Sequence, residues 1–334
     1  MKTLIIAEAG VNHNGNLDLA LKLCDEAKRA GADVVKFQTW KTENMITRNV
    51  GQADYQKKNT GSKKSQYDML KELELAYQDF EKIKTYCDSI AIQFASTADD
   101  PESLDFLVDL GVPFLKIGSG DLNNIPYLRH IGQKHLPVIL STGMGSLSDV
   151  DVSLSTLQES GAGNITLLHC TTNYPCPYKD VNLNAMKTLR EAFHLPVGYS
   201  DHTLGIEIPI AAAAMGAVVI EKHFTLDRTM EGPDHAASIQ PDELMQMVQC
   251  IRNVECALGN GLKKPTQEEK SISKVVVKRI VAAKEIEKGQ VFTEKNLTVK
   301  RNDKGMPATC WDFIIGKKAQ QRYLENQEIV FYKE

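Results

Sequence analysis

The stretch from Val197 to His223 decides the fold. It begins with Val197-Gly198-Tyr199-Ser200-Asp201-His202, continues through a helical pattern, and ends with Ala217-Val218-Val219-Ile220-Glu221-Lys222-His223. Each of the two apolar runs is short and is followed at once by polar side chains. This pattern is typical of buried parallel strands whose carboxyl ends line a functional site.

Six further apolar runs of the same kind precede this stretch, and amphipathic segments alternate with them. Among these segments, Leu17 to Ala30 and Leu183 to Phe193 have the apolar spacing of helices, and Gly31 closes the first. A doubly wound open sheet would give the same local signal, but eight strands in a chain of this length favour a closed (β/α)8 TIM barrel. The other predicted strands are Leu4 to Ala7, Asp33 to Phe37, Ile92 to Ala95, Phe114 to Ile117, Val138 to Leu140 and Ile165 to Leu168.

Composition excludes several classes of protein. The formal charge of −4 and the pI of about 6.1 provide no general electrostatic attraction to nucleic acid or to an anionic membrane. The longest apolar stretch, Pro209 to Ile220, is too short to span a bilayer, and the apolar segment at the N-terminus is too short for a signal peptide. The seven cysteines form no CxxC pair, which predicts reduced thiols in a cytoplasmic protein.

The chain is expected to contain two domains. We predict a catalytic barrel domain at 1–265, a charged linker at 266–278 and a small, mostly β domain at 279–334. Within the barrel, a long polar excursion from Trp40 to about Glu74 interrupts the alternation of strands and helices. Such an excursion is functional or disordered in most compact domains, and a solvated decoration is the alternative.

His202 and His223 follow the seventh and eighth predicted strands. Because neighbouring strands of a barrel end at the same rim, these two imidazoles are expected to lie close together. Together they could hold a divalent ion with open positions for substrate oxygens. The alternative is that each histidine is hydrogen-bonded structure, which would be the better interpretation of a lone histidine.

Lys36 and Lys116 each end an otherwise apolar strand, so each must pair with an anion or lose its proton. They could clamp a polyanionic substrate with hydrogen bonds from Ser119, Ser141 and Ser200, or one could be a Schiff-base nucleophile. Two lysines beside three hydroxyl groups favour the clamp. Structural pairing of the lysines with Glu8 or Asp201 is the remaining alternative.

Two further candidate segments lie after the first and eighth strands. Glu8 is followed by Asn12-His13-Asn14-Gly15, which offers a carboxylate and amides for orienting hydroxyl groups or moving a proton. Asn14 or Asn16 could instead cap the following helix. Asp234, in Gly232-Pro233-Asp234-His235, could reach the same cavity or could simply belong to a turn.

These segments resemble, in order, the motifs of bacterial sialic acid synthases. The family includes N-acetylneuraminate synthases and the relatives that make N,N'-diacetyllegionaminate. The resemblance covers nearly the whole chain, because Ile286-x-Lys288-Gly289, Asn296-Leu297 and Val299-Lys300-Arg301 are similar to the antifreeze-like (SAF, β-clip) domain of these enzymes. The barrel motifs are 6-IAEAGVNHNG-15, 35-VKFQT-39, 116-KIGSG-120, 140-LSTGM-144, 168-LHCT-171, 199-YSDH-202, 221-EKHF-224 and 232-GPD-234.

The resemblance implies a reaction. The family condenses phosphoenolpyruvate with an open-chain N-acetylated amino sugar and water, and releases phosphate by C–O cleavage. The primary expectation is N-acetylmannosamine as the sugar and N-acetylneuraminate as the product. The alternative sugar is 2,4-diacetamido-2,4,6-trideoxymannose, which gives N,N'-diacetyllegionaminate. Outside this family, a Schiff-base aldolase and a non-catalytic carbohydrate-binding protein are the competing hypotheses.

The resemblance also implies roles for individual residues. His202 and His223 would bind Mn²⁺ or Mg²⁺, which polarises the sugar aldehyde. Arg301 would reach the sugar site of a partner subunit in a domain-swapped homodimer. The residues that match phosphoenolpyruvate-binding positions are Lys36, Thr97, Lys116, Ser119, Ser141 and Ser200, and those that match sugar-binding positions are Glu8, Gln38, Tyr174, Asp234 and Arg301. Glu8 is also the expected proton-transfer group.

One departure from the family pattern concerns charge. The family commonly has Ser-Thr-Pro-Phe after the third strand, whereas this chain has Ser96-Thr97-Ala98-Asp99. The sequence therefore predicts an additional negative charge, on Asp99, near the phosphate side of the site.

Overall fold

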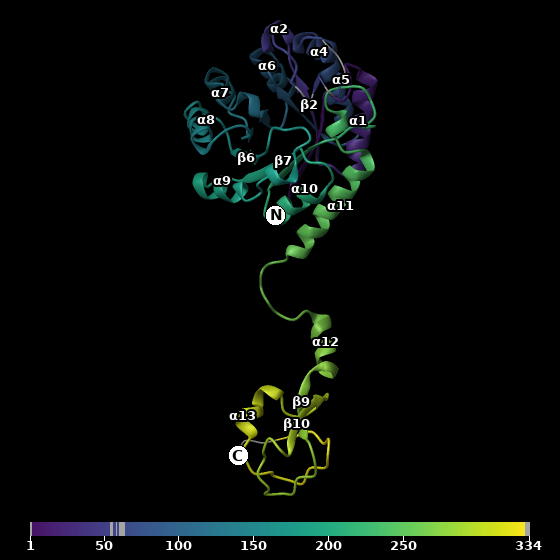
Figure 1. Ribbon diagram of the computed structural model, residues 1–334, viewed down its shortest axis with the longest axis vertical. Helices are drawn as coiled ribbons and strands as arrows, with labels where there is room; N and C mark the ends of the chain where they lie inside the picture. Colours follow the sequence, from purple (N-terminus) through teal and green to yellow (C-terminus); the bar gives the residue numbers. More distant parts are fainter. Residues whose placement is uncertain (1, 54–55, 58, 60–63, 331–334) are drawn as a thin grey trace. The chain divides into compact units, whose positions relative to one another are not determined.

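The computed structural model describes residues 2–53, 56–57, 59 and 64–330 (Figure 1). The chain divides into two compact units, Met1–Gly259 and Asn260–Glu334. Among the described residues, none of the helices is both long enough and apolar enough to cross a membrane.

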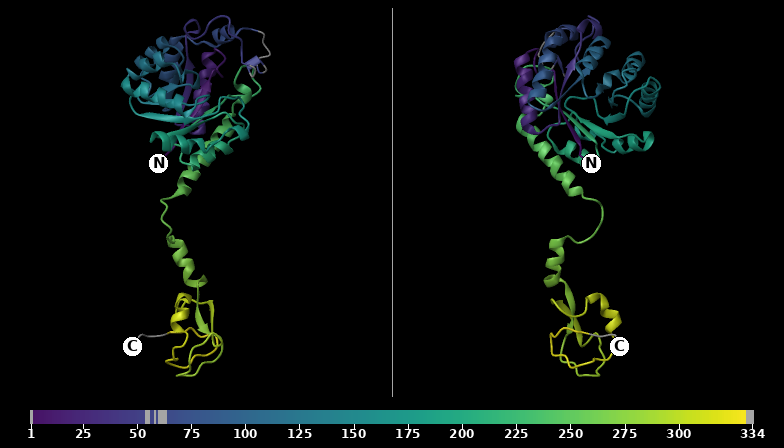
Figure 2. Two further views of the ribbon diagram at one scale, coloured as in Figure 1. Left: turned by 60° about the vertical axis from the view of Figure 1, so that its left-hand side comes forward. Right: turned by 180° about the vertical axis from the view of Figure 1, so that it is seen from behind.

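The first unit is a closed barrel of eight parallel strands, as the sequence predicted. Each strand pairs with the next one along the chain, and β8 pairs with β1 to close the sheet. Figure 2 shows helices on the outside of these strands from two directions. The strands are β1 (Leu4–Gly10), β2 (Val34–Thr39), β3 (Gln93–Ala98), β4 (Leu115–Ile117), β5 (Val138–Ser141), β6 (Ile165–His169), β7 (Val197–Asp201) and β8 (Val219–His223).

The helices around the barrel begin and end where local chemistry predicts. Asn16 caps α1 by accepting a hydrogen bond from the Leu19 amide, and Gly31 ends this helix in the left-handed conformation with φ 82°. Of the two asparagines considered for this cap, Asn16 is therefore the one that forms it. The helices are α1 (Leu17–Ala30), α5 (Tyr77–Ser89), α6 (Pro101–Leu110), α7 (Ile125–Gly132), α8 (Leu147–Glu159), α9 (Ala185–Phe193), α10 (Glu207–Ala214) and α11 (Pro241–Leu258).

Side-chain alternation along the strands creates two layers inside the barrel. In β1, Ile5, Ala7 and Ala9 pack outward against the helices, whereas Ile6 packs inside the barrel. The inner apolar layer, called the floor below, consists of Ile6, Val34, Ala95, Phe114, Ile139, Leu168 and Val219. The next inward positions toward the carboxyl ends of the strands form the rim of the barrel.

Parts of the polar excursion after β2 are packed into a second, smaller cluster. It contains α2 (Thr42–Met45) and α4 (Gln66–Leu73), and Trp40 is only 2% exposed. This cluster comprises Val11, Trp40, Met69, Leu70 and Leu73. Trp40 and α4 of the excursion are therefore packed against Val11 of the barrel, whereas residues 47–51 between them are exposed.

The second unit has its own small core. Its strands β9 (Lys278–Ala282) and β10 (Leu297–Arg301) pair antiparallel, and α13 (Trp311–Ile314) packs with them. The core residues are Ile280, Ala282, Ile286, Phe292, Leu297, Ile314, Ala319, Tyr323 and Ile329. The stretch predicted as a linker contains α12 (Gln267–Val276), a helix that buries none of its residues.

Candidate active site

Charged side chains form the rim of the barrel between β1, β2, β4 and β8. The Lys36 Nζ lies 2.5 Å from Glu8 Oε2 and 3.7 Å from Glu221 Oε2. The Lys116 Nζ lies 3.5 Å from Glu221 Oε1 on the other side of the same carboxylate. All four side chains are at most 6% exposed, so two buried lysines share two buried carboxylates.

The hydroxyl groups predicted near this cluster are attached to its charged members. Lys36 donates to Thr97 Oγ1 at 2.9 Å, and Lys116 donates to Ser141 Oγ at 2.8 Å. Ser200 donates to Glu221 at 2.9 Å. Five of the six residues predicted to bind phosphoenolpyruvate therefore join one network. The sixth, Ser119, is contacted instead by the amide of Gly143 and the thiol of Cys170.

The two carboxylates of this cluster have opposite shifts in pKa. Burial raises the pKa of Glu8 to about 7, an effect that Lys36 only partly offsets. Burial also disfavours the charged form of Glu221, but Lys116, Lys36 and the Ser200 hydroxyl outweigh it and lower this pKa to about 2. Glu221 is thus the permanent countercharge of the two lysines, whereas Glu8 gains and loses its proton near neutral pH.

The protonation of Lys36 bears on the aldolase hypothesis. Burial disfavours its charged form, but Glu221 and Glu8 outweigh burial, and the pKa of Lys36 is raised. A Schiff-base nucleophile needs a free amine, and therefore a lowered pKa. The environment of Lys36 favours an anion clamp over a nucleophile.

The histidine pair lies at the ends of β7 and β8. The ring centroids of His202 and His223 are 5.6 Å apart, and the Tyr174 ring lies 4.1 Å from the His202 ring. Burial lowers the pKa of both histidines, so both are neutral near pH 7. The sequence prediction that these two rings meet at the rim agrees with their placement.

The imidazoles are suited to hold a divalent ion. His202 Nδ1 lies 2.7 Å from the Thr171 carbonyl oxygen, which places the proton on Nδ1 and leaves the Nε2 lone pair for a ligand. The His223 Nδ1 is buried and has no hydrogen-bond partner among the described residues. The described part of the chain contains no group of three or more His, Cys, Asp or Glu side chains that could hold a metal. His202 and His223 are the side chains that could hold a metal here.

The residues predicted to contact the sugar are distributed between the two units. Gln38 donates to Glu8 Oε1 at 3.1 Å, and Tyr174 packs against the histidine pair. Asp234 is 9% exposed, and burial raises its pKa to about 6. Arg301 is an exposed residue at the end of β10 in the second unit.

The charge predicted for Asp99 is weaker than the sequence suggested. Burial, followed by repulsion from Asp121, raises the pKa of Asp99 to about 8, although Lys36 partly offsets this rise. Asp99 is therefore mostly protonated at neutral pH. The additional negative charge expected near the phosphate side is largely absent under these conditions.

Glu221 is the functional residue to which sequence reasoning gave no role. Glu221 belongs to the motif 221-EKHF-224, but its contact with both lysines was not predicted from the sequence. Strand alternation contains the missing signal, because Val219, Glu221 and His223 are successive inward positions of β8.

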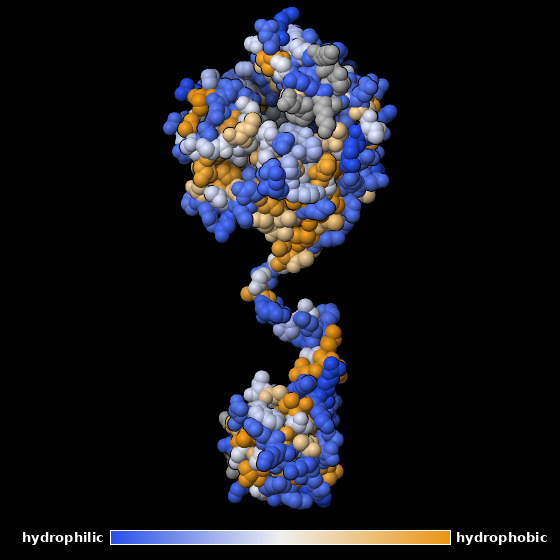
Figure 3. Space-filling model, viewed as in Figure 1, coloured by the Kyte–Doolittle hydropathy of each residue, from blue (hydrophilic) through white to orange (hydrophobic). Residues whose placement is uncertain are grey.

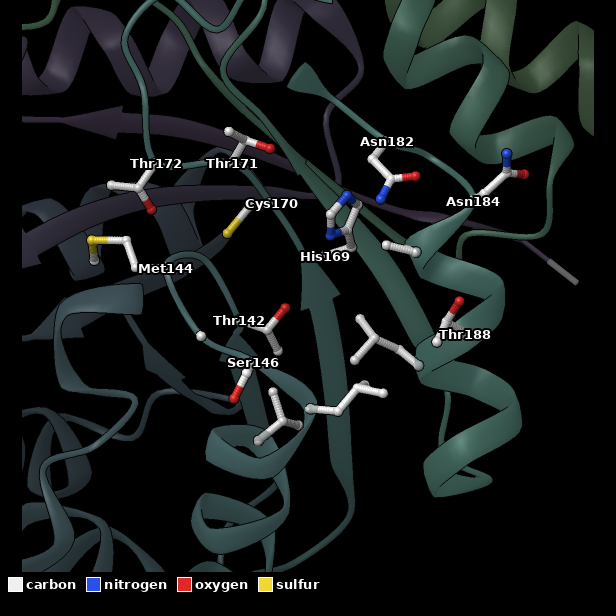
Figure 4. Close-up of a pocket in the computed structure, with 15 residues that line it drawn as sticks. Thr142, Met144, Ser146, His169, Cys170, Thr171, Thr172, Asn182, Asn184 and Thr188 are labelled. Carbon is white, nitrogen blue, oxygen red and sulfur yellow. The ribbon is translucent and has the colours of Figure 1, made fainter. Parts of the chain in front are cut away.

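A cavity of about 530 Å³ lies beside this rim, between the loops after β5 and β6 (Figure 4). Figure 4 shows Thr188 on α9 and Asn184 just before this helix at one side, and Thr171 and Thr172 at another. The cavity approaches the rim through Cys170, whose Sγ lies 3.2 Å from Ser119 Oγ. Its lining is uncharged and includes hydroxyl, amide and apolar groups.

Comparison with known proteins identifies the family of the chain. The NeuB family model matches residues 23–263. The chain belongs to the NeuB family. The SAF domain model matches residues 277–329, so the second unit is the expected antifreeze-like domain.

Similar proteins include legionaminic acid synthases and N-acetylneuraminate-9-phosphate synthases. The chain is 48% identical to N,N'-diacetyllegionaminic acid synthase of Campylobacter jejuni, over 98% of this chain and 99% of the relative. The corresponding enzyme of Legionella pneumophila is 47% identical over 95% of this chain and 90% of the relative. Human N-acetylneuraminate-9-phosphate synthase is 36% identical over 98% of this chain and 91% of the relative.

Solved structures agree with these assignments. The crystal structure of N-acetylneuraminic acid synthetase from Leptospira borgpetersenii has a TM-score of 0.72 and 36% identity, and covers 81% of this chain and 90% of that one. The NeuB family member described here is therefore an enzyme of the sialic acid and legionaminic acid synthase type.

Proposed function

We propose that this enzyme condenses phosphoenolpyruvate with 2,4-diacetamido-2,4,6-trideoxymannose and water to give N,N'-diacetyllegionaminate and phosphate. The observation that supports this sugar is the near full-length similarity, at 48% and 47% identity, to two N,N'-diacetyllegionaminic acid synthases. N-acetylmannosamine, with N-acetylneuraminate as product, is the second candidate. The 36% identity to the Leptospira synthetase supports it.

Phosphoenolpyruvate binds at the lysine side of the rim. Its phosphate and carboxylate accept charge-assisted hydrogen bonds from Lys36 and Lys116, with further donors from Thr97 and Ser141, which accept from these lysines and keep their own protons to donate. Ser200 joins them by turning its hydroxyl group from Glu221 to the substrate. Ser119 donates from the neighbouring loop. Glu221 lies close to both lysines and holds them together before the anion arrives.

The amino sugar binds beside the histidines in its open-chain form. Asp234, Gln38 and Tyr174 orient its hydroxyl and amide groups, and the aldehyde lies toward His202 and His223. These two imidazoles would hold Mn²⁺ or Mg²⁺, which when bound supplies Lewis-acid polarisation of the aldehyde oxygen.

Carbon–carbon bond formation begins when C3 of phosphoenolpyruvate attacks the aldehyde carbon. Glu8 lies between Lys36 and Gln38, and its pKa of about 7 allows it to give a proton to the oxygen of that aldehyde. Attack leaves an electron-poor C2, and water adds to this carbon while returning one proton to the Glu8 carboxylate. The resulting tetrahedral carbon expels phosphate by breaking the bond between C2 and the phosphate oxygen, and the proton of its hydroxyl group leaves with the phosphate.

The SAF domain completes the sugar site of a second copy in a domain-swapped homodimer, to which Arg301 contributes its guanidinium group. Exposed apolar side chains around α12 support an association of this kind (Figure 3). They are Ile272, Val275, Val276 and Val277, each at least 40% exposed. The seven cysteines are all free thiols, which fits a cytoplasmic enzyme.

Phosphate release from phosphoenolpyruvate tests the reaction. The assay contains Mn²⁺ and compares 2,4-diacetamido-2,4,6-trideoxymannose, N-acetylmannosamine and a control without sugar. Release with the diacetamido sugar alone supports the proposal, and release with N-acetylmannosamine alone identifies a neuraminate synthase. Failure of both sugars to cause release would contradict the proposed function.

The dimer is tested separately by sedimentation and by Arg301→Ala. We expect a dimer, and in the variant a larger increase in the KM for the sugar than in that for phosphoenolpyruvate. Lys300→Ala, at the neighbouring exposed position, is the control. A monomer of full activity, or an unchanged KM for the sugar in Arg301→Ala, would remove the SAF domain from the site.

A further inference from the structure

A polar network, buried around Asn12 and Ser238 and partly exposed around Asn14, joins the loop after β1 to the loop after β8. The first loop contains Asn12, His13 and Asn14, which the proposed mechanism does not use. The second contains the segment 231–238, which carries Asp234. Its only helical part among the described residues is the three-residue turn His235–Ala237, so the position of Asp234 depends on contacts from outside the segment.

Asn12 supports the backbone of Asp234 through one intermediate side chain. Its Nδ2 donates to the Phe224 carbonyl oxygen at 2.8 Å and to Ser238 Oγ at 3.0 Å. The Ser238 hydroxyl then donates to the Asp234 carbonyl oxygen at 2.8 Å. Asn12 and Ser238 are both 0% exposed, so water does not compete for these bonds.

Asn14 holds the same segment at two more points. Its Nδ2 donates to the Glu231 carbonyl oxygen at 2.9 Å, and its Oδ1 lies 3.0 Å from His235 Nε2. Because the amide nitrogen of Asn14 is already a donor, Oδ1 must accept, and His235 carries its proton on Nε2. His235 Nδ1 in turn lies 2.6 Å from Thr225 Oγ1.

Asn14 and His235 are closely packed against Gly232. A Cβ added to Gly232 would lie 2.6 Å from His235 Cδ2 and 2.9 Å from Asn14 Oδ1. A residue larger than glycine at this position would therefore push the pair apart. The excursion adds another contact, since Asn59 Nδ2 donates to the Pro233 carbonyl oxygen at 2.7 Å.

We propose that Asn12 and Asn14 are positioning residues that set the location of Asp234 in the amino-sugar site. The inference rests on the proposed function, which places Asp234 against the sugar. Asn12 acts through Ser238 on the backbone of Asp234, and Asn14 acts through Glu231 and His235 on the two sides of it. The hydrogen bonds of Asn12 and Asn14 go to the loop after β8 and not to Lys36 or Lys116.

Kinetic comparison of Asn14→Ala and Ser238→Ala with the wild type tests this assignment. We expect the KM for the sugar to rise about tenfold or more in both, because small displacements of positioning groups can cost up to ~10²-fold. The KM for phosphoenolpyruvate should remain within about twofold, since its ligands lie on other strands. Asn16→Ala is the matched control, because it removes the cap of α1 and leaves the network intact. Equal increases in both KM values, or no increase, would overturn the inference.

A second pair of measurements separates positioning from general loss of stability. In the double variant Asn14→Ala with Asp234→Asn, the KM for the sugar should be no higher than in Asp234→Asn alone, because Asn14 acts through Asp234. If the increases in the KM for the sugar from the two single substitutions multiplied in the double variant, Asn14 would not act through Asp234.

Hydrogen exchange provides a test that does not depend on activity. Amides in 231–238 should exchange faster in Asn14→Ala than in the wild type, with β1 and β8 still protected. If neither sugar reacts with the wild-type enzyme, the proposed function fails, yet this exchange still shows whether Asn14 holds the segment. Unchanged exchange in 231–238 would overturn the positioning role even in an active enzyme.

Discussion

The floor and the rim of the barrel are adjacent layers of the same strands. The side chains of the floor are apolar, whereas those of the rim are charged or polar. Ile6, Val34, Phe114 and Val219 fill the floor. Two residues further along, the same strands carry Glu8, Lys36, Lys116 and Glu221 at the rim. A step of two residues keeps the side chain on the inner face and moves it toward the carboxyl end.

This difference shows how one scaffold separates stability from chemistry. The floor is held by close packing, so its side chains are constrained in volume. The rim is held by ion pairs and hydrogen bonds, whose partners can be exchanged for substrate groups. In β7 the floor position is Gly198, where a Cβ would lie 2.5 Å from the Val219 carbonyl oxygen, and the rim position above it is Ser200.

The largest effect on activity is expected from a substitution at the rim. His223→Ala should lower kcat/KM by about 10³-fold, because metal polarisation of the substrate is worth several kcal/mol. The midpoint of unfolding should change little. His130→Ala is a suitable control, since His130 pairs with Asp105 outside the barrel. Full activity of His223→Ala would eliminate the assignment of the metal site.

The next effect concerns the floor, where a substitution should lower stability and leave activity nearly unchanged. Leu168→Ala removes a side chain that is 0% exposed and should lower the free energy of unfolding by about 3 kcal/mol. Activity measured well below the melting temperature should remain within about threefold of the wild type. Leu168→Met, which keeps the volume, is the control. A loss of activity without a loss of stability would abolish the distinction between the two layers.

A smaller effect is expected for one lysine of the anion clamp. Lys116→Met should raise the KM for phosphoenolpyruvate between about tenfold and a hundredfold, because a charged hydrogen bond contributes about 1.5 to 3 kcal/mol. Lys134→Met provides a surface control, since Lys134 pairs with Asp105. Steady-state kinetics with both substrates varied would show whether the KM for the sugar stays unchanged. An equal increase in that constant would place Lys116 at both substrates.

Sequence reasoning predicted the layers well because they follow from local patterns. The number of strands, the helix at Leu17 to Ala30 and the meeting of His202 with His223 all depend on alternation and on the common rim of a barrel. Family resemblance supplied the antifreeze-like domain at the C-terminus. Each of these predictions needed only the order of elements along the chain.

Pairing within the rim was predicted only in part, because the contact of Lys36 with Glu8 was one of the alternatives and the contacts of both lysines with Glu221 were not. Whether Lys36 approaches Glu8, Glu221 or Asp201 depends on the tilt and stagger of the strands, which spacing along one strand does not contain. The same limit applies to Asp99, whose charge depends on burial and on the neighbouring Asp121. The pairing of Asp201 with Lys222 across β7 and β8 was also outside the reach of spacing.

The smallest effect concerns the pH dependence of stability, which distinguishes Glu8 from Glu221. The pKa of Glu8 is raised to about 7 by burial, whereas that of Glu221 is lowered to about 2 by the lysines, which outweigh burial. Between the ordinary carboxyl pKa of 4.5 and pH 7, folded Glu8 keeps a proton that the unfolded chain has released. Stability from Glu8 therefore falls as the pH rises through this window, and stability from Glu221 falls only as the pH drops below 4.5.

Replacement of Glu8 with glutamine tests whether Glu8 makes the protein less stable as the pH rises. Between about pH 5 and pH 7, the wild type should lose up to about 1 kcal/mol per pH unit more than Glu8→Gln does. The raised pKa of Asp234 comes from burial alone and is the same in both proteins. Glu8→Gln also removes a repulsion that raises the pKa of Asp99, but burial is the largest cause of that rise, so the difference between the two curves reports chiefly on Glu8. Urea unfolding followed by Trp40 fluorescence, in a Trp311→Phe background, reports on the barrel alone because the chain has two tryptophans. Parallel curves would mean that Glu8 is ionised throughout, and that the rim carries both carboxylates as fixed charges.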